Sequence, residues 1–381
     1  MIAKVTFIAS AAFIIYVVAG YPVLLAWIAR RGEKPVRSLG ALKTVSVLIA
    51  VHNGGNFIRG KLESIFALNY PRELIEVFVL SDGSTDDTES IARQFDGVTV
   101  ISLPRGGKCA ALTRGFTLAR NEILVLTDVR QRLNSDSLRH LVANFSDPEI
   151  GAVSGELIIL RGETQEEADV GLYWRYESRI RRDLARIDSM FGATGPFYAI
   201  RRSLVVPIPR EILLDDMYLP LSAYFRGYRL VVDEDARAYD FPTTLDTEFR
   251  RKVRTLAGNW QLFRYYPQLL GPLNRMWFHY VSYKLGRLLL PYALISIATA
   301  SFFLPSPLNL LALTAQALLY CLPVLDGILP QSSFLKRISS LARTFVVMMA
   351  ATICAVSVFF IPPQDLWKIT TIRGRTTNDL S

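Results

Sequence analysis

The chain has 381 residues, of which 51% are hydrophobic and 20% are charged, and its formal net charge is +9. A mean hydropathy of +0.26 is high for a wholly soluble protein, so we expect the apolar excess to lie in membrane segments. The three cysteines have no spacing typical of a disulfide framework or a zinc site, which argues against both. No nucleic-acid-binding motif is present, so anionic lipid and anionic small molecules explain the positive charge better than nucleic acid does.

The first thirty residues predict a membrane anchor. Val5–Ala29 contains no charged residue and is long enough to cross a hydrocarbon layer of roughly 30 Å. A cleaved signal peptide would have a shorter apolar region, so an uncleaved anchor is favoured. Only Lys4 precedes the segment, whereas four basic residues follow it, and this asymmetry predicts a cytoplasmic location for the domain that comes next. These residues are Arg30, Arg31, Lys34 and Arg37.

Three further apolar stretches lie near the other end, at Leu285–Leu304, Leu308–Leu325 and Leu341–Ile361. Lys336 and Arg337 agree with a cytoplasmic loop before the last stretch. Three spans after a cytoplasmic domain would, however, send the basic tail outside. Either one stretch is re-entrant or interfacial, or the tail departs from the charge rule. That tail contains Lys368, Arg373 and Arg375.

The middle of the chain repeats one local pattern. Val45–Val51 is a β-branched run that ends at a polar, glycine-rich turn, and Phe57–Leu68 then has helical spacing. The same alternation of strand, polar turn and helix continues along the chain. It predicts a mostly parallel sheet covered by helices. The later segments are Glu76–Leu80, Thr88–Phe95, Val98–Leu103, Lys108–Ala119 and Glu122–Leu126.

Polar side chains follow three of these predicted strands: Asn53, Asp82 and Asp128. Each by itself is most simply a turn or helix-cap residue. Ligands of such sheets bind beyond the carboxyl ends of the strands, and polar clusters recur at that edge here. The repetition therefore favours a binding site.

Together these segments resemble glycosyltransferase family 2, in particular its membrane-bound branch with the cellulose, chitin and hyaluronan synthases. The resemblance covers about Val45 to Gln261. It implies a GT-A fold, a nucleoside-diphosphate sugar donor that is usually UDP-linked, and inversion at the anomeric carbon. In order, the matching segments are Val47–Asn53, the D-G-S-T-D of Asp82–Asp86, the G-K-x-x-A-L of Gly107–Leu112, Asp128, Leu214–Asp216 for T-E-D, and Arg251–Thr255, where only the Arg of Q-Q-x-R-W is kept.

The expected fold class is therefore an α/β GT-A domain flanked by transmembrane helices. We expect it to belong to a multi-pass protein of a bacterial inner membrane, with the catalytic domain in the cytoplasm. The expected divisions are an anchor at 1–29, a basic linker at 30–44, the GT-A domain at 45–248, interfacial amphipathic helices at 249–280, and a region of about three spans with a basic tail at 281–381.

The resemblance places Asp82 where the family holds the uracil and ribose. A carboxylate can accept hydrogen bonds from these groups, and Gly83 permits close approach of the ligand. An Asx turn is the simpler alternative for Asp82. Asn53 is expected in the same donor-binding set, whereas Lys108 either approaches the donor or only begins its helix.

Asp128 is the predicted ligand of Mg²⁺ or Mn²⁺, because these hard ions favour oxygen ligands and keep substrate phosphates in their shell. The sequence departs from the family here, since Arg130 replaces the second Asp of D-x-D. Strict metal dependence is therefore open. Arg130 is an alternative partner for the phosphates.

Asp216 is the candidate general base for the acceptor hydroxyl. Its neighbour Asp215 would raise its proton affinity, and helix capping is the alternative for this pair. Phe191–Phe197 resembles the family loop beside the acceptor, although ordinary turns have a similar composition.

Arg251 and Arg254 lie three residues apart and would share a helix face that grips the diphosphate. A cationic face of an amphipathic helix against the membrane is the alternative. Thr255 replaces the family Trp and so removes an aromatic platform, while Trp260 lies nearby. His140 and His279 have no partners at metal spacing and are interpreted as structural.

The sequence thus predicts transfer of a sugar from a nucleoside diphosphate to an acceptor at the cytoplasmic membrane face, in exopolysaccharide or capsule synthesis. The expected partners are membrane lipids, a polysaccharide or lipid acceptor, and export proteins. Single addition of a sugar to a lipid is one alternative. A catalytically silent scaffold of an export complex is another, supported by Arg130 and opposed by the retained Asp128 and Asp216. A transporter is disfavoured because no charge lies deep in the apolar stretches.

Overall fold

The computed structural model describes residues 1–38, 40, 42–160, 165–241, 245–330 and 333–366. These residues form two compact units, which are described separately below. The first unit holds the described parts of 1–31, 161–180 and 242–366, and the second holds those of 32–160 and 181–241. The sequence-based domain at 45–248 thus contains two described stretches, 165–180 and 245–248, that belong by their contacts to the first unit.

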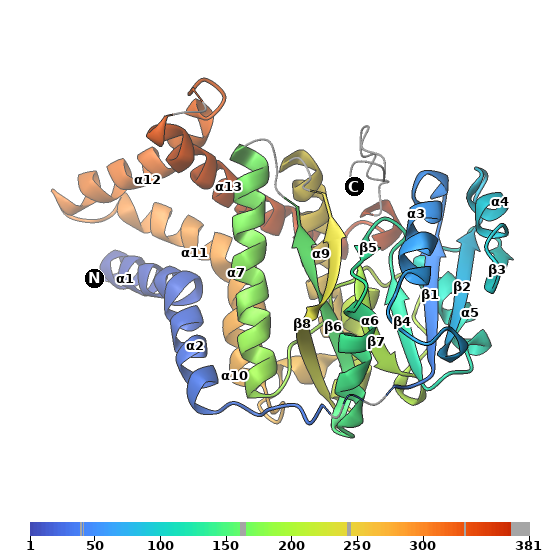
Figure 1. The fold of residues 1–381 in the computed structure, drawn as a ribbon. Helices are drawn as coiled ribbons and strands as arrows, with labels where there is room; N and C mark the ends of the chain where they lie inside the picture. Colours follow the sequence, from blue (N-terminus) through green and yellow to red (C-terminus); the bar gives the residue numbers. More distant parts are fainter. Residues whose placement is uncertain (39, 41, 161–164, 242–244, 331–332, 367–381) are drawn as a thin grey trace. The chain divides into compact units, whose positions relative to one another are not determined.

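The second unit is built on an eight-stranded sheet with the order β3-β2-β1-β4-β7-β6-β8-β5 (Figure 1). The four strands β3, β2, β1 and β4 are mutually parallel, β7 runs antiparallel to β4 and β6, and β8 is parallel to β6. The strands are β1 (Val45–Val51), β2 (Ile75–Asp82), β3 (Val98–Leu103), β4 (Ile123–Thr127), β5 (Arg132–Leu133), β6 (Ile150–Ile159), β7 (Phe197–Arg201) and β8 (Arg229–Asp240).

The central strands β1 and β4 are mostly apolar because both faces of the sheet are covered. All five residues of β4 are buried, and six of the seven residues of β1 are buried. Helix α5 (Lys108–Leu118) contacts β1 and β2. Gly115 allows this close approach, since a Cβ atom there would lie 2.6 Å from the Leu80 side chain. The predicted mostly parallel sheet is confirmed, and α5 begins at the predicted residue.

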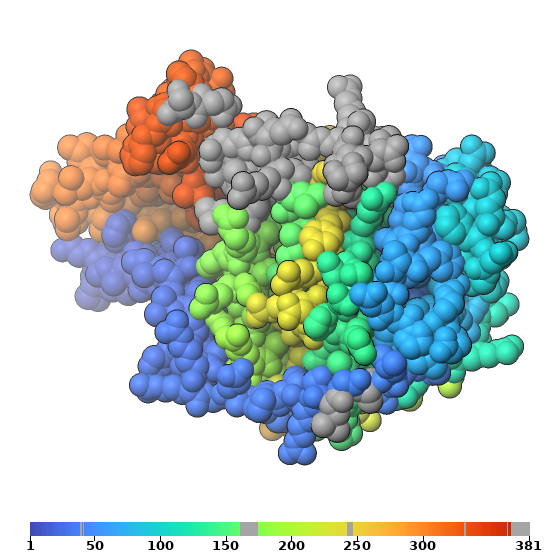
Figure 2. All heavy atoms as spheres, viewed as in Figure 1, coloured from blue at the N-terminus to red at the C-terminus, as the bar shows by residue number. Residues whose placement is uncertain are grey.

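Short helices complete this unit. In the space-filling view, α3 and α4 lie together on its surface (Figure 2), consistent with their mutual contacts. The remaining elements connect the strands or begin after them. They are α3 (Gly55–Phe66), α4 (Thr88–Ala92), α6 (Ser137–Ala143), α8 (Asp215–Tyr224), the end of α7 (Gln165–Ile187), and the 3-10 turns η2 (Arg72–Leu74), η3 (Asn144–Ser146) and η4 (Arg202–Leu204).

The first unit is helical. Its elements are α1 (Ile2–Ile15), η1 (Tyr16–Gly20), α2 (Tyr21–Arg31), the start of α7, α9 (Leu245–Tyr265), η5 (Pro267–Leu270), α10 (Trp277–Tyr280), η6 (Val281–Leu285), α11 (Gly286–Ser301), α12 (Leu308–Leu325), α13 (Phe334–Cys354), η7 (Ala355–Phe359) and η8 (Pro363–Leu366). Three helical stretches among the described residues are long and apolar enough to cross a membrane: Ile2–Arg31, Leu308–Leu325 and Phe334–Phe359. The predicted stretch at Leu285–Leu304 is not among them, because α11 has only 16 residues.

Helices α12 and α13 are joined by a buried ionic cluster. Asp326 is fully buried, and its carboxylate lies 3.0 Å from the Lys336 ammonium and 3.1 Å from the Arg343 guanidinium. The Ser339 hydroxyl donates to the same carboxylate at 2.9 Å. The basic residues at the start of α13 are therefore partly neutralised within the hairpin.

Candidate active site

The parallel strands bring three loops to one edge of the sheet. Asn53, which has a φ of 51°, accepts a hydrogen bond from the Thr85 backbone N–H at 2.8 Å. The backbone N–H of Gly55 donates to the Asp86 carboxylate at 2.9 Å. The structure therefore ties the turn after β1 to the D-G-S-T-D segment after β2, as expected for adjacent parallel strands.

Asp82 lies at the end of β2 and is 3% exposed. Its carboxylate accepts hydrogen bonds from the backbone N–H groups of Gly106 at 2.6 Å and Gly107 at 3.0 Å, and it pairs with Arg105. Gly83 and Gly107 have φ values of +65° and +86°, which favour glycine. Asp82 therefore fixes the loop before α5, and its role toward the base and ribose stays a prediction.

Lys108 occupies the centre of the site. Its ammonium lies 3.0 Å from Asp128 Oδ1 and 3.2 Å from Asp215 Oδ2. Burial alone would lower the pKa of Lys108, but Asp128, Asp215 and Asp216 together raise it well above its usual value. A charged ammonium thus connects the predicted metal ligand Asp128 with the predicted catalytic pair. Lys108 therefore does more than begin helix α5.

Asp128 follows β4 directly and keeps a negative charge. Burial would raise the pKa of its carboxyl, but the Lys108 ammonium, with smaller contributions from Arg130 and Lys61, holds that pKa below its usual range. Asp128 is therefore ionised at neutral pH and available to a cation or to a hydrogen-bond donor of the substrate.

Arg130, which stands at the second D-x-D position, has a carboxylate partner. Its guanidinium pairs with Asp240 at the end of β8, a residue that is 4% exposed. The Gln131 side-chain amide donates to the same carboxylate at 2.8 Å. The sequence did not identify Asp240 or Gln131, because Asp240 is separated by about 110 residues from the Arg130–Gln131 segment that it binds.

Asp215 and Asp216 occupy the first turn of α8, whose N-cap residue is Leu214. The Asp216 carbonyl accepts a hydrogen bond from the Ala193 N–H at 2.7 Å. A Cβ atom on Gly195 would lie 2.9 Å from Asp216 Oδ2, so the loop passes directly over this carboxylate. The structure therefore brings the predicted acceptor loop and the predicted general base together.

The Gly195→Ala substitution tests this proximity. The added methyl group would displace the Asp216 carboxylate or the loop, so we expect kcat/KM to fall roughly tenfold to a hundredfold. Thermal stability should change little if the carboxylate moves aside. Initial rates and melting temperature of the variant measure both effects. Unchanged kinetics would contradict the close approach. Gly327→Ala is the control, because a Cβ atom there meets nothing within 4 Å and, as at Gly195, the backbone φ is not positive.

Arg181, near the end of α7, supports the same loop. It donates to the Ser154 hydroxyl at 2.9 Å and to the side chain of Thr194. Ser154 in turn accepts from the Thr194 backbone N–H at 2.9 Å. Sequence reasoning missed Arg181, since it is one of several arginines on a long helix and only the fold selects it.

The two predicted diphosphate ligands on α9 belong to the first unit. Arg251 pairs with the buried Glu248 at 2.9 Å, and its guanidinium lies 5.5 Å from the centre of the Trp174 ring. Thr255 donates back to the Arg251 carbonyl at 2.8 Å. The action of Arg251 and Arg254 on the diphosphate stays a prediction.

The remaining aromatic and histidine residues that the sequence singled out have local partners. Trp260 packs edge-on against Phe263 and Phe359. The Nδ1 atom of His279 lies 3.2 Å from the Tyr21 hydroxyl, consistent with a structural role.

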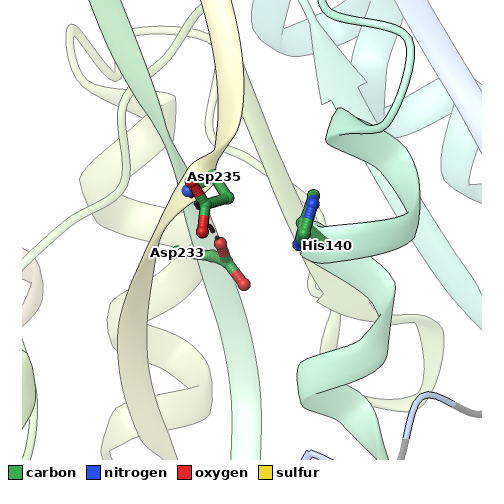
Figure 3. A group of neighbouring side chains, drawn as sticks. All are labelled: His140, Asp233 and Asp235. Carbon is green, nitrogen blue, oxygen red and sulfur yellow. Dashed lines mark hydrogen bonds between the residues drawn. The ribbon is translucent and has the colours of Figure 1, made fainter.

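His140 does have neighbours at metal-binding distance, in contrast to the expectation from its sequence spacing. Figure 3 shows it facing Asp233 and Asp235 of β8, and one ligand atom of each lies within 4.8 Å of the others. The two carboxylates already have partners: Asp233 accepts from the Asn144 side chain at 2.7 Å, and Asp235 pairs with Arg237 at 2.9 Å. These contacts explain the group, whose residues belong to α6 and β8 and not to the loop that carries Asp128.

Comparison with known families decides the class of this site. Residues 46–206 match the family model described as Glycosyl transferase family 2. The chain carries a glycosyltransferase family 2 domain. The predicted resemblance and the predicted enzyme class are therefore confirmed, and the matched region contains Asn53, Asp82, Lys108 and Asp128.

Several characterised proteins are similar to this glycosyltransferase. The beta-monoglucosyldiacylglycerol synthase of Nostoc is 33% identical over 121 residues, which cover 30% of this chain and only 26% of that protein. The poly-beta-1,6-N-acetyl-D-glucosamine synthase of Staphylococcus epidermidis is 23% identical over 84% of this chain and 78% of its own length.

A solved structure supports the fold. The mannosyltransferase PcManGT of Pyrobaculum calidifontis, in complex with GDP-Man and Mn²⁺, aligns over 94% of this chain and 99% of its own with a TM-score of 0.72 and 22% identity. At that identity the likeness shows the fold alone. It confirms the GT-A fold of the glycosyltransferase.

The site fits a divalent cation with one protein carboxylate. Asp128 is ionised, and Mg²⁺ or Mn²⁺ is commonly held by one or two carboxylates together with substrate phosphates. The second D-x-D position does not contribute, since Arg130 is paired with Asp240. The role of Asp128 as the metal ligand stays a prediction.

Proposed function

We propose that this glycosyltransferase moves a sugar, with inversion, from a nucleoside diphosphate to an acceptor at the cytoplasmic membrane face. The observation that carries the proposal is the ion-pair series through Lys108. This ammonium contacts both Asp128, on the donor side, and Asp215, which precedes the base candidate Asp216. We therefore assign donor and acceptor to one site.

The acceptor hydroxyl would lose its proton to Asp216 as its oxygen attacks the anomeric carbon. The Asp216 carboxylate lies next to the Gly195 backbone, and the Ala193 N–H holds the backbone carbonyl of the same residue. Attack opposite the leaving nucleotide needs no covalent enzyme intermediate and inverts the anomeric centre. The neighbouring Asp215 pairs with the Lys108 ammonium at 3.2 Å, which offsets its charge.

The leaving nucleoside diphosphate accumulates negative charge, and the chain offers fixed cations for it. Lys108 and Arg130 lie at the strand-end edge, each already oriented by a carboxylate. A divalent cation bound at Asp128 would supply further charge stabilisation to the departing diphosphate. We propose a UDP-linked donor on the family resemblance, with Arg251 and Arg254 as additional diphosphate ligands.

Three helices fit a simple membrane topology. With Ile2–Arg31 crossing once and Leu308–Leu325 and Phe334–Phe359 crossing as a hairpin, a cytoplasmic domain is followed by a cytoplasmic tail. This removes the conflict over the basic tail that three C-terminal spans created. Lys336 would then lie on the far side, where Asp326 offsets its charge.

For the acceptor, we propose a growing polysaccharide. The proposal is supported by the resemblance to the membrane-bound polysaccharide synthases and by the similarity to the poly-beta-1,6-N-acetyl-D-glucosamine synthase, which extends over 84% of this chain. Single addition to a membrane lipid is the second candidate, supported by the similarity to beta-monoglucosyldiacylglycerol synthases, which covers 30% of this chain at 33% identity for the Nostoc protein and 88% at 23% identity for the Synechocystis protein. A silent scaffold is disfavoured because it would need neither Lys108 between Asp128 and Asp215 nor the loop over Asp216.

A donor panel tests the proposal. Membranes that contain the full chain are given labelled UDP-linked and GDP-linked sugars with Mg²⁺ or Mn²⁺, and the product is sized. We expect one donor to be consumed and a polymeric product to form. A product of lipid mobility would select the second candidate, and no transfer from any donor, with membranes that express the folded protein, would refute the enzymatic proposal.

A further inference from the structure

Lys61 is a lysine buried beneath the donor site. It lies on α3, its side chain is 1% exposed, and its ammonium donates to the Thr127 hydroxyl at 2.6 Å and to the Gln131 carbonyl at 2.8 Å. Lysines are rarely buried this completely without a paired carboxylate. Burial lowers the pKa of Lys61 to about 7, against the opposing effect of the Asp128 charge.

Its two acceptors mark the ends of one short segment. Thr127 and Gln131 enclose Asp128 and Arg130, the residues proposed to face the metal and the diphosphate. A single ammonium therefore fixes both ends of the segment relative to α3. A hydrocarbon side chain of the same length would fill the space without the desolvation cost, but it could not hold these two oxygens.

The contact continues toward the acceptor side. The Thr127 hydroxyl donates to the Pro196 carbonyl at 2.7 Å, and the Asp128 backbone N–H donates to the same carbonyl at 3.3 Å. Pro196 follows Gly195, whose backbone passes over Asp216. The series Lys61–Thr127–Pro196 thus connects the donor segment with the loop at the proposed base.

We propose that Lys61 is a positioning residue of the transfer site, which holds the Asp128 segment and the Gly195 loop in register through the Thr127 hydroxyl. The inference rests on the proposed function, because it assigns Lys61 to the same donor and acceptor site. Lys61 acts through these groups and does not itself reach the substrates.

The first test compares Lys61→Met with Lys43→Met in the full membrane-bound chain. Lys43 pairs with Glu122 at 2.7 Å near the start of β1, so this control removes a lysine from the opposite edge of the sheet. We expect Lys61→Met to lower kcat/KM for the donor roughly tenfold or more, since small displacements of reacting groups have effects of this size. The apparent affinity for Mn²⁺ should fall as well, and Lys43→Met should resemble the wild type.

Stability separates positioning from a structural role. Because the pKa of Lys61 falls from 10.5 in the unfolded chain to about 7 in the folded one, the unfolded state binds more protons between these values. Wild-type stability should therefore rise with pH across this window, while that of Lys61→Met lacks this rise. At pH 7 we expect the melting temperature of Lys61→Met to be equal to or higher than that of the wild type. Any difference in favour of the variant should become smaller by about pH 9.5. The Asp128 charge also affects the pKa of Lys61. The same stability measurement on Asp128→Asn therefore serves as a control for the contribution of that carboxylate.

Thr127→Val supplies a second route if Lys61→Met fails to fold. It keeps the shape of the side chain but removes the hydroxyl that accepts from Lys61 and donates to Pro196. Its kcat/KM should fall in the same direction, and the double variant should lose less than the product of the two single effects, as expected for residues in one network.

Several outcomes would overturn the inference. These are wild-type kinetics in both single variants, strictly multiplicative effects in the double variant, or a loss of activity in Lys61→Met that only follows a loss of folded protein. They are distinct from failure of the proposed function, in which the wild type itself transfers no sugar from any donor in the panel.

Discussion

Replacing Asp216 by Asn is expected to lower kcat about a thousandfold, within the range observed when a general base is lost. Asn has nearly the same shape but cannot take a proton from the acceptor hydroxyl. The Gly195 loop should stay in place, because its hydrogen bond from Ala193 goes to the backbone carbonyl of residue 216 and not to the side chain. Donor binding should therefore change little.

Initial rates at saturating acceptor measure kcat, and KM for the donor reports on binding separately. We expect KM to stay within about threefold of the wild type, since the interaction removed belongs to the transition state. Asp96→Asn is a suitable control, because Asp96 is exposed and precedes β3, at the opposite edge of the sheet from the site. A rate for Asp216→Asn close to that of Asp96→Asn would remove Asp216 from the role of general base.

The parallel half of the sheet could be predicted from local sequence alone. Strands β1, β2 and β4 are short apolar runs because they are covered on both faces, and each is followed by polar turn residues. These signals are contained within a few residues. The turn residues then share an edge because parallel strands do, which is why the sequence pattern is enough to group Asn53, Asp82 and Asp128.

The antiparallel half could not be predicted in the same way. The place of β7 between β4 and β6 depends on pairing between residues far apart in the chain. The partner of Arg130 is equally remote: Asp240 reaches it only because β8 pairs in parallel with β6 and also with β5, next to the Asp128 segment. The sequence showed the departure from D-x-D but not the carboxylate that neutralises the arginine.

Lys61 shows a further limit of sequence reasoning. On a helix with alternating charged and apolar residues, a lysine is normally assigned to the solvent face. Here α3 packs so that Lys61 lies under the β4–β5 connection. Its ammonium donates hydrogen bonds to the Thr127 hydroxyl and the Gln131 carbonyl. Only the register of the helix against the sheet distinguishes this lysine from an exposed one.

Replacing Lys108 by Met is the second substitution with a large expected effect. The variant leaves Asp128, Asp215 and Asp216 without the ammonium that now lies 3.0 Å from the first and 3.2 Å from the second. Asp215 is only 4% exposed, so it would become a buried carboxylate without this cation. Lys108 donates a charge-assisted hydrogen bond to Asp128, and loss of one such bond, about 1.5–3 kcal/mol, corresponds to a fall in kcat/KM of roughly tenfold to a hundredfold.

Lys108→Arg distinguishes charge from shape. It keeps the positive charge but places a planar, larger group in the same space, so we expect it to recover part of the activity that Lys108→Met loses. If the ammonium serves only to neutralise the three carboxylates, a divalent cation in excess should partly restore Lys108→Met, because the cation can take over that charge at Asp128. If it contacts the donor diphosphate instead, KM for the donor should rise and added metal should not lower it. Wild-type kinetics in both variants would show that the ion pairs through Lys108 hold the fold together without taking part in sugar transfer.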